Sequence, residues 1–348
     1  MVLEKKIFGM PCGVDFPRSL ASGILKFFSA HPPEVLARVN IVVNTKRMRL
    51  RLLEEFVSLG SILIPNVHVV SDLSELIGTF KDPNPKSHLQ YRFELMGLVQ
   101  KLIEQQPDLA SKSALYDLSD NLAKLIDELQ GENVAPSIIK KLNVEDQSGH
   151  WQRILHFIDI VTTYLEKRNL EPDSEGFQRN QVRALLKGWE EFPPENYIFI
   201  AGSTGSRGTT LELIKGIYGL NKGVVVLPGF DFHIPETVLG SISDPLIGED
   251  HPQYRFVKML KGLNVKYKDV GIWPTGSPPS IPRNKLISLA LRPAPFTDSW
   301  MSEGPKLECL DRACEGLSLF EAENQREEAL AIAMAVSYTH LRAHETLL

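Results

Sequence analysis

The sequence predicts an α/β protein built on a parallel sheet, with a large helical insertion. Short runs of β-branched and aromatic residues recur without polar alternation, which is typical of strands buried on both faces. Amphipathic helical patterns follow most of these runs, as in a sheet covered by helices on both sides. Residues 71–190 interrupt this order with helical patterns alone. We therefore expect one α/β domain that contains an inserted helical subdomain.

Composition narrows the class of protein. The chain has 348 residues, of which 43% are hydrophobic and 23% charged, so it is long enough for two domains with a sizeable core. The net charge of −5 means that any nucleic-acid binding needs a local basic patch. Cys12, Cys309 and Cys314 are too few and too scattered for a disulfide framework or a four-cysteine metal site. No apolar run is long enough to span a membrane and the first residues are no signal peptide, so we expect a cytoplasmic protein without a membrane partner.

The most informative stretch runs from Tyr197 to Thr210. A buried strand, Tyr197–Ile200, leads into a Gly/Ser loop, and a helix opens at Thr209. Free amide groups and the positive end of the helix dipole converge there, which favours a phosphate or nucleic-acid contact. No Lys follows the glycines, so the loop is not a P-loop, and a simple strand-to-helix turn is an equally good interpretation. The candidate loop residues are Gly202, Ser203, Thr204, Gly205 and Ser206.

The first strand, Lys6–Met10, is followed by the turn where a nucleotide-binding α/β domain carries its P-loop. Gly9 and Gly13 are separated by three residues where that motif needs four. Val14 stands in the place of the phosphate-binding Lys, and Asp15 in the place of the Ser or Thr that holds magnesium. A carboxylate at this helix start repels phosphate, so we expect no ATP hydrolysis here.

The second strand, Val39–Val43, leads into the most basic segment of the chain. Asn44 and Thr45 cap a helix that carries four cations within six residues. A solvated helix face is the commoner meaning of such a run, and we weigh it against a contact with the phosphate backbone of DNA. The candidate DNA-binding residues are Asn44, Thr45, Lys46, Arg47 and Arg51; Arg49 completes the run.

Regular apolar spacing predicts the helices of the insertion, and Ser61–Val70 precedes them as further strand. These helices are expected at Arg92–Ile103, Ser113–Leu129 and His150–Leu165.

After the insertion, Gly223–Leu227 is a fully apolar strand that ends near Asp231. Asp231 is a candidate general base or magnesium ligand, but a turn-forming role is the better interpretation for one isolated carboxylate. Helices are expected within Glu249–Leu260 and at Leu286–Arg292. A last strand, Leu317–Ala322, precedes a helix that Asn324 and Glu327 open as an N-cap pair.

These elements give four segments. Residues 1–70 and 191–316 form the split α/β domain, and residues 71–190 form the inserted helical subdomain. Residues 317–335 are interpreted as the start of a second α/β domain, and residues 336–348, which lose the helical stripe, as a non-native tail.

Several stretches in this order resemble the AddB family of alphaproteobacterial type, the double-strand break repair subunit of the AddAB helicase–nuclease. They include IFGMPCGVDF, IVVNTKRMRLRLLEEF, IFIAGSTGSRGTTLELI, GVVVLPGFDF, HPQYRFVKMLKGL and LALRPAPFTDSW. The resemblance covers the chain from Lys6 to about Ala335, and its phrases are specific as a set.

The resemblance implies a degenerate RecA-like fold of the superfamily 1 helicase type. It also implies DNA and an AddA-like motor subunit as partners, in an ATP-dependent helicase–exonuclease complex that serves recombinational repair. The family's nuclease domain, iron–sulfur cluster and magnesium site belong to a region that this sequence does not include, so we expect no cofactor here. Asn44, Thr45 and Lys46 take the place of a helicase motif that touches DNA. Gly202–Ser206 follows the strand that bears the magnesium-binding acid in the family, and Ala201-Gly202 replaces that acid here.

Three functions follow as hypotheses. The first is a helicase-like scaffold, without its own ATPase, that binds DNA and its motor partner. The second is a phosphate- or nucleotide-binding enzyme that uses the Gly202–Ser206 loop with Asp231 as base. The third is a structural scaffold whose residues 71–190 dock the partner.

Overall fold

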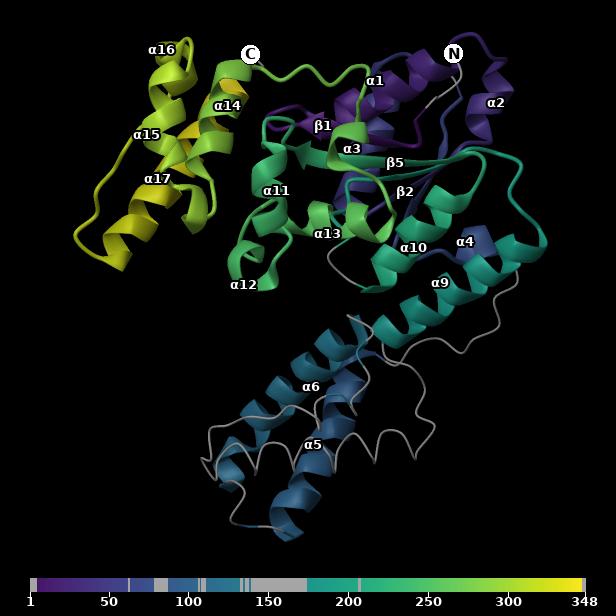
Figure 1. Ribbon diagram of the computed structural model, residues 1–348. Helices are drawn as coiled ribbons and strands as arrows, with labels where there is room; N and C mark the ends of the chain where they lie inside the picture. Colours follow the sequence, from purple (N-terminus) through teal and green to yellow (C-terminus); the bar gives the residue numbers. More distant parts are fainter. Residues whose placement is uncertain are drawn as a thin grey trace.

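A six-stranded sheet, parallel throughout, forms the centre of the protein (Figure 1). The computed structural model describes residues 5–61, 63–77, 87–105, 107, 111–131, 134, 138, 174–205 and 208–345. The strands lie in the order β3-β2-β4-β5-β1-β6. Their bounds are β1 Ile7–Pro11, β2 Asn40–Val43, β3 Asn66–Val69, β4 Ile198–Ala201, β5 Gly223–Phe230 and β6 Gly271–Ile272.

Helices cover both faces because the strands are apolar on both sides. In β2, Ile41 and Val43 belong to one buried cluster and Val42 to the other. The first cluster lies beneath α1 (Phe16–Phe28), α2 (Pro33–Ala37) and α3 (Lys46–Ser58). The second lies beneath α9 (Ser174–Glu191), α10 (Gly208–Gly219) and α13 (Tyr254–Gly262). The predicted α/β class with a parallel sheet is confirmed.

The strand order sets this sheet apart from the commonest nucleotide-binding orders. In the Rossmann and flavodoxin orders the first two strands are neighbours. Here β4 and β5 lie between β1 and β2. The chain moves toward one edge from β1 to β3 and then returns across the sheet to β6. The connections therefore change face, which opens crevices at the carboxyl ends of the strands.

Close approach to aromatic rings explains two glycines. A Cβ on Gly9 in β1 would lie 2.7 Å from the Phe230 side chain, so a larger residue would displace that ring. Gly23 in α1 faces the ring of Trp273, whose Nε1 donates a hydrogen bond to the Ser19 carbonyl at 2.9 Å. Trp273 directly follows β6, a two-residue strand that the sequence analysis did not predict. This contact ties the sheet edge to the first helix.

The insertion contains a helical pair with its own small core. α5 (His88–Gln105) and α6 (Leu115–Gly131) pack through Leu95, Val99, Leu122 and Ile126, as their apolar spacing predicts. In Figure 1 this pair extends away from the sheet below α9. α9 itself buries residues against the sheet, so the last part of the insertion belongs to the α/β core. The helix expected at residues 150–165 lies outside the described residues.

Further helices complete the described chain. Among them α14 confirms the helix expected near residue 286, and α13 the one expected near residue 254. The α-helices not yet named are α4 Ser74–Ile77, α11 Glu236–Ile242, α12 Pro245–Gly248, α14 Ile281–Ala290, α15 Ser299–Glu303, α16 Leu310–Cys314 and α17 Gln325–Glu345. Single 3₁₀ turns lie at Lys112–Ala114, Tyr267–Asp269, Ala294–Phe296 and Gly304–Lys306.

The strand expected at residues 317–322 is wrong. These residues form no strand, and Leu319 and Phe320 are exposed. An apolar run becomes a strand only where a neighbouring strand pairs with it, and none of the described strands lies beside this run. The N-cap that follows is confirmed, since the Glu327 amide donates to Asn324 Oδ1 at 3.0 Å. α17 continues through part of the segment interpreted as a tail, as far as Glu345.

Candidate functional site

The strand order places two switch points at the carboxyl edge of the sheet, which we term the first and the second crevice; each lies between strands whose following helices cover opposite faces. The first crevice lies between β1 and β5, since β1 leads to α1 on one face and β5 leads to α11 and α13 toward the other. The second crevice lies between β2 and β4, which lead to α3 and α10. Ligands of open α/β sheets bind at such positions.

In the first crevice, the turn after β1 is closed by a carboxylate. Asp15 is the N-cap of α1, and its Oδ1 accepts a hydrogen bond from the Arg18 amide at 3.3 Å. Gly13 has a positive φ of 84°, which sharpens the turn before the helix. An amide at the start of α1, which a P-loop would offer to phosphate, is thus already bonded to a negative group. The structure agrees with the interpretation that this turn does not bind phosphate.

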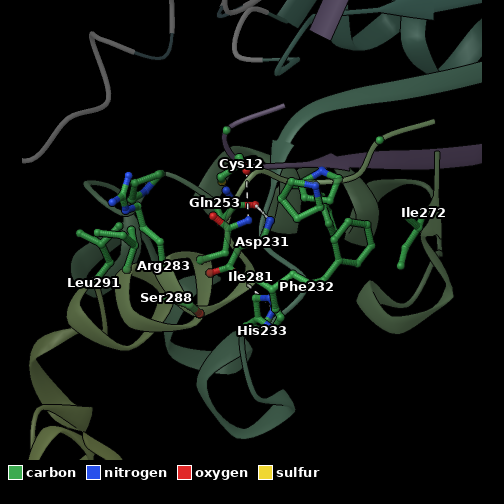
Figure 2. Close-up of a pocket in the computed structure, with 18 of the residues that line it drawn as sticks. Cys12, Asp231, Phe232, His233, Gln253, Ile272, Ile281, Arg283, Ser288 and Leu291 are labelled. Carbon is green, nitrogen blue, oxygen red and sulfur yellow. Dashed lines mark hydrogen bonds between the residues drawn. The ribbon is translucent and has the colours of Figure 1, made fainter. Parts of the chain in front are cut away.

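A cavity of about 520 Å³ opens beside this turn. Its walls come from the segments after β1 and β5, from the loop before α13, from the loop after β6 and from α14 (Figure 2). Most of the wall is apolar, and a small number of polar side chains interrupt it. The lining residues include Cys12, Phe230, Asp231, Phe232, His251, Gln253, Ile287 and Ser288.

Hydrogen bonds hold the loop after β5 in place. Gln253 donates from Nε2 to the Gly229 carbonyl at 2.8 Å and accepts from the Asp231 amide at 3.1 Å. The Tyr267 hydroxyl donates to the Asp231 carbonyl at 2.7 Å. Asp231 Oδ1 accepts from the His233 amide at 2.8 Å, which confirms the turn-forming role. The cavity wall is thus fixed by side chains from two other segments.

Burial favours the uncharged forms of three side chains in or beside this cavity, Cys12, Tyr267 and His251. It raises the pKa of the Cys12 thiol, and the nearby Asp231 carboxylate raises it further. It also raises the pKa of Tyr267, again with help from Asp231. It lowers the pKa of His251, although Asp231 opposes that shift. His251 Nδ1 accepts from the Gln253 amide at 3.1 Å, so the neutral ring carries its proton on Nε2. A thiol, a phenol and a neutral imidazole do not form an activated nucleophile.

The second crevice brings together the two sets of residues that the sequence analysis selected. Asn44 directly follows β2 and Gly202 directly follows β4, and the two strands pair in parallel. A Cβ on Gly202 would lie 3.7 Å from Asn44 Oδ1 and 3.4 Å from the Phe16 ring. Thr45 caps α3, because its Oγ1 accepts from the Met48 amide at 3.1 Å. The Gly/Ser loop and the basic helix start therefore share one edge.

The cations of α3 divide into two groups. Arg49 donates from Nε to the Val67 carbonyl at 2.8 Å, and Arg51 pairs with the buried Glu55 at 2.7 Å. Lys46 and Arg47 are exposed, and among the described residues neither has a hydrogen-bond or ion-pair partner. Arg51 also lies 3.8 Å from Asp15, so its charge is largely balanced. Of the four cations, Lys46 and Arg47 are therefore the ones that are free to contact a phosphate, which is fewer than the sequence pattern indicated.

The loop after β4 is shaped by its glycines. Gly202 and Gly205 have positive φ values of 77° and 62°. Ser203 Oγ accepts a hydrogen bond from the Gly205 amide at 3.2 Å. Thr204, between these two residues, is exposed. Ser206 lies outside the described residues. None of the described loop residues lines the cavity of the first crevice, so this loop and Asp231 do not form one site.

Several residues of the first crevice were not selected from the sequence. Gln253 lies in the phrase HPQY and Tyr267 in a 3₁₀ turn, and both reach the loop after β5 through side-chain hydrogen bonds. The local sequence around a polar residue does not reveal which distant residue its side chain will bond. The crevice is identified only from the observed strand order, because ligands of open α/β sheets bind where neighbouring strands lead to helices on opposite faces.

The described residues contain no group of three or more His, Cys, Asp or Glu side chains placed to hold a metal ion. None of the described helices is long and apolar enough to cross a membrane. No protein-family model matches this sequence, and no curated protein matches it.

Proposed function

We propose that this chain is the helicase-like part of a double-strand break repair helicase–nuclease subunit of the AddB type. In this role it binds DNA and an AddA-like motor subunit, and it has no ATPase of its own. A parallel sheet with helices on both faces is compatible with a RecA-like domain. The α/β sheet and the sequence resemblance support the same assignment.

One observation carries the DNA-binding part of this proposal. The free cations Lys46 and Arg47 lie at the start of α3, beside the Gly202 loop at one edge of the sheet. At that edge the backbone turns sharply at Gly202 and Gly205, and Lys46 and Arg47 are exposed. Phosphate contacts of this kind need no particular base sequence.

Charge reversal at Lys46 and Arg47 tests the proposal. Binding of a forked DNA duplex by the full chain, alone and with its motor partner, is measured by fluorescence anisotropy across a salt series. The double variant Lys46→Glu/Arg47→Glu should bind more weakly and lower the salt slope by about one unit for each lost phosphate contact. Lys101→Glu/Lys124→Glu, on the exposed surfaces of α5 and α6, makes the same change in net charge and should bind like the parent. Equal loss in both variants would reject this edge as the binding site.

The helical pair supports a role in partner binding. Leu89 and Phe93 are exposed on one side of α5, where they are four residues apart, and Tyr116 is exposed on α6. Exposed apolar side chains on each of two paired helices favour a protein contact. Co-purification with the motor subunit, lost on Phe93→Asp while folding is retained, would support this role.

The alternative of a phosphate-binding enzyme is weaker. It requires the Gly202 loop and a base at Asp231 around one ligand, whereas these residues lie in different crevices. Asp231 also bonds a backbone amide of its own turn. The structure offers no specific observation in favour of this enzyme.

A further inference from the structure

The cavity of the first crevice has the size and position of a small-molecule site. Its volume of about 520 Å³ falls within the range of small-molecule pockets, and it opens at a point where the connections change face. Phe232 is half-buried and provides aromatic surface in its wall, whereas Phe230 is buried and already stacks on Tyr267. Ser288 lines the cavity, is 3% exposed, and its Oγ has no hydrogen-bond partner among the described residues. A buried hydroxyl without a partner is destabilising unless a ligand or water bonds it.

Most of the donors around the cavity are already used. The Cys12 thiol donates to the Gly229 carbonyl at 3.3 Å, and Asn284 Nδ2 donates to the Cys12 carbonyl at 3.0 Å. The Gln253 amide and the Tyr267 hydroxyl donate to the loop after β5, as described above. Arg283 donates to the Ala313 and Glu315 carbonyls at the end of α16. These side chains therefore have little left to offer an anionic ligand.

An acceptor remains available. Asp231 lines the cavity, its Oδ1 bonds the His233 amide, and it forms no ion pair with any of the described residues. A carboxylate in a mainly apolar cavity favours a ligand that donates N–H groups and repels one that carries phosphate. Arg292 is buried nearby and has Glu303 at 3.7 Å, but it is not part of the cavity wall.

We propose that this cavity binds a planar nitrogen heterocycle that carries an N–H donor and no anionic group, of which the adenine ring is an example. The ring of Phe232 stacks on the heterocycle, the Asp231 carboxylate accepts from its amino group, and the Ser288 hydroxyl bonds a ring nitrogen. The Asp231 carboxylate in the wall disfavours the phosphates that a nucleotide would bring. This site is separate from the DNA-binding edge and does not depend on that assignment.

Three probes test the ligand class by isothermal titration calorimetry on the full chain: adenosine, purine riboside and ATP. Adenosine should bind. Purine riboside, which lacks the amino group, should bind about tenfold more weakly, and ATP should bind more weakly still. Equal affinity for ATP and adenosine would overturn the proposal, and so would the absence of adenosine binding at millimolar concentration.

Three variants test the residues. Asp231→Asn should weaken adenosine binding by about tenfold or more, while Asp117→Asn, exposed on α6, should leave it unchanged. Ile287→Trp places an indole in the cavity from a position that is 41% exposed, so it should block binding without unfolding the chain. Unchanged affinity in Asp231→Asn and in Ile287→Trp would place any binding elsewhere.

A competition experiment identifies the source of the ring. A short single strand of deoxyadenosines that displaces bound adenosine would show that a base within a nucleic-acid strand enters the cavity. Failure to displace it would assign the cavity to a free nucleoside or base. Loss of DNA binding in Lys46→Glu/Arg47→Glu with adenosine binding retained would separate this site from the DNA-binding edge.

Discussion

The two crevices are made by the same geometry and have opposite chemistry. Each lies between parallel strands whose following helices cover opposite faces of the sheet. The first crevice is partly enclosed, its loop is held by Gln253 and Tyr267, and it contains the carboxylate of Asp231. The second is open and presents the free cations Lys46 and Arg47 beside Gly202.

This difference shows that strand topology creates a position for a ligand and that local side chains decide what it accepts. A helix start stands beside both crevices, which by itself favours an anion. At the first, the Asp15 carboxylate caps α1 and cancels that preference. At the second, the uncharged Thr45 caps α3 and leaves the basic residues beside it available. The capping residues therefore contribute, with Asp231 in the first crevice and the cations of α3 in the second, to the opposite charge of the two sites.

Removal of the Gln253 side chain should have the largest effect on the free energy of unfolding, because its hydrogen bonds hold the loop of the first crevice. Gln253 is 5% exposed and bonds both the Gly229 carbonyl and the Asp231 amide. Gln253→Ala leaves these backbone groups without their partner, so we expect a loss of about 3 kcal/mol in the free energy of unfolding. Urea denaturation followed by circular dichroism measures it.

Gln100→Ala, which removes an exposed hydrogen bond to Glu104, is the matched control and should cost less than about 0.5 kcal/mol. DNA binding by Gln253→Ala should stay at the parent level. A parallel loss of DNA binding in the folded variant would show that the two crevices are coupled, contrary to the separation described here.

Replacement of Arg51 should have a smaller effect on the free energy of unfolding. It tests whether this arginine stabilises α3 or binds DNA. Arg51→Ala leaves the buried carboxylate of Glu55 without its closest cation, at a site where the arginine itself is half exposed. We expect a loss of about 1 kcal/mol in the free energy of unfolding and little change in the salt slope of DNA binding. A fall in that slope as large as for Lys46→Glu/Arg47→Glu would return Arg51 to the DNA-binding set.

Much of the fold could be predicted from the sequence, because the signals were local. The apolar runs at residues 39–43, 197–200 and 223–227 are strands, and Asn324 caps the helix that follows it. The strand expected at residues 317–322 failed for the opposite reason, since a run of that kind needs a neighbouring strand that no local pattern specifies. β6 was missed because two residues give no periodicity.

The candidate sites were predictable only where the key residues follow a strand directly. Asn44 and Gly202 do so, and parallel pairing of β2 and β4 brings them together. The cavity of the first crevice depends on segments far apart in the sequence, such as the bond from Asn284 to the Cys12 carbonyl. The balance of charge on Arg51 also needs tertiary structure, because Asp15 comes from another helix.

Acidification should have the smallest effect on the free energy of unfolding. It acts through two histidines, His68 in β3 and His251 in the first crevice. Burial lowers the pKa of His68, against the opposing influence of Glu75, while Arg49 adds to the lowering and Asp72 opposes it. Burial likewise lowers the pKa of His251 in the first crevice, where Asp231 opposes the shift and Arg292 adds to it. Both rings are therefore neutral in the folded chain at pH values where the unfolded chain already binds protons.

The sign of the effect follows from this difference in bound protons. The unfolded chain takes up protons first as the pH falls below about 6.5, so the two histidines stabilise the fold above that pH and the stabilisation is lost below it. The slope should stay below about 1.4 kcal/mol per pH unit for each histidine. Urea denaturation between neutral and mildly acidic pH measures it, with the exposed His31 replaced by Gln as a control that should keep the slope. His68→Gln and His251→Gln should each reduce the slope, and a slope unchanged in both variants would assign the pH dependence to other groups.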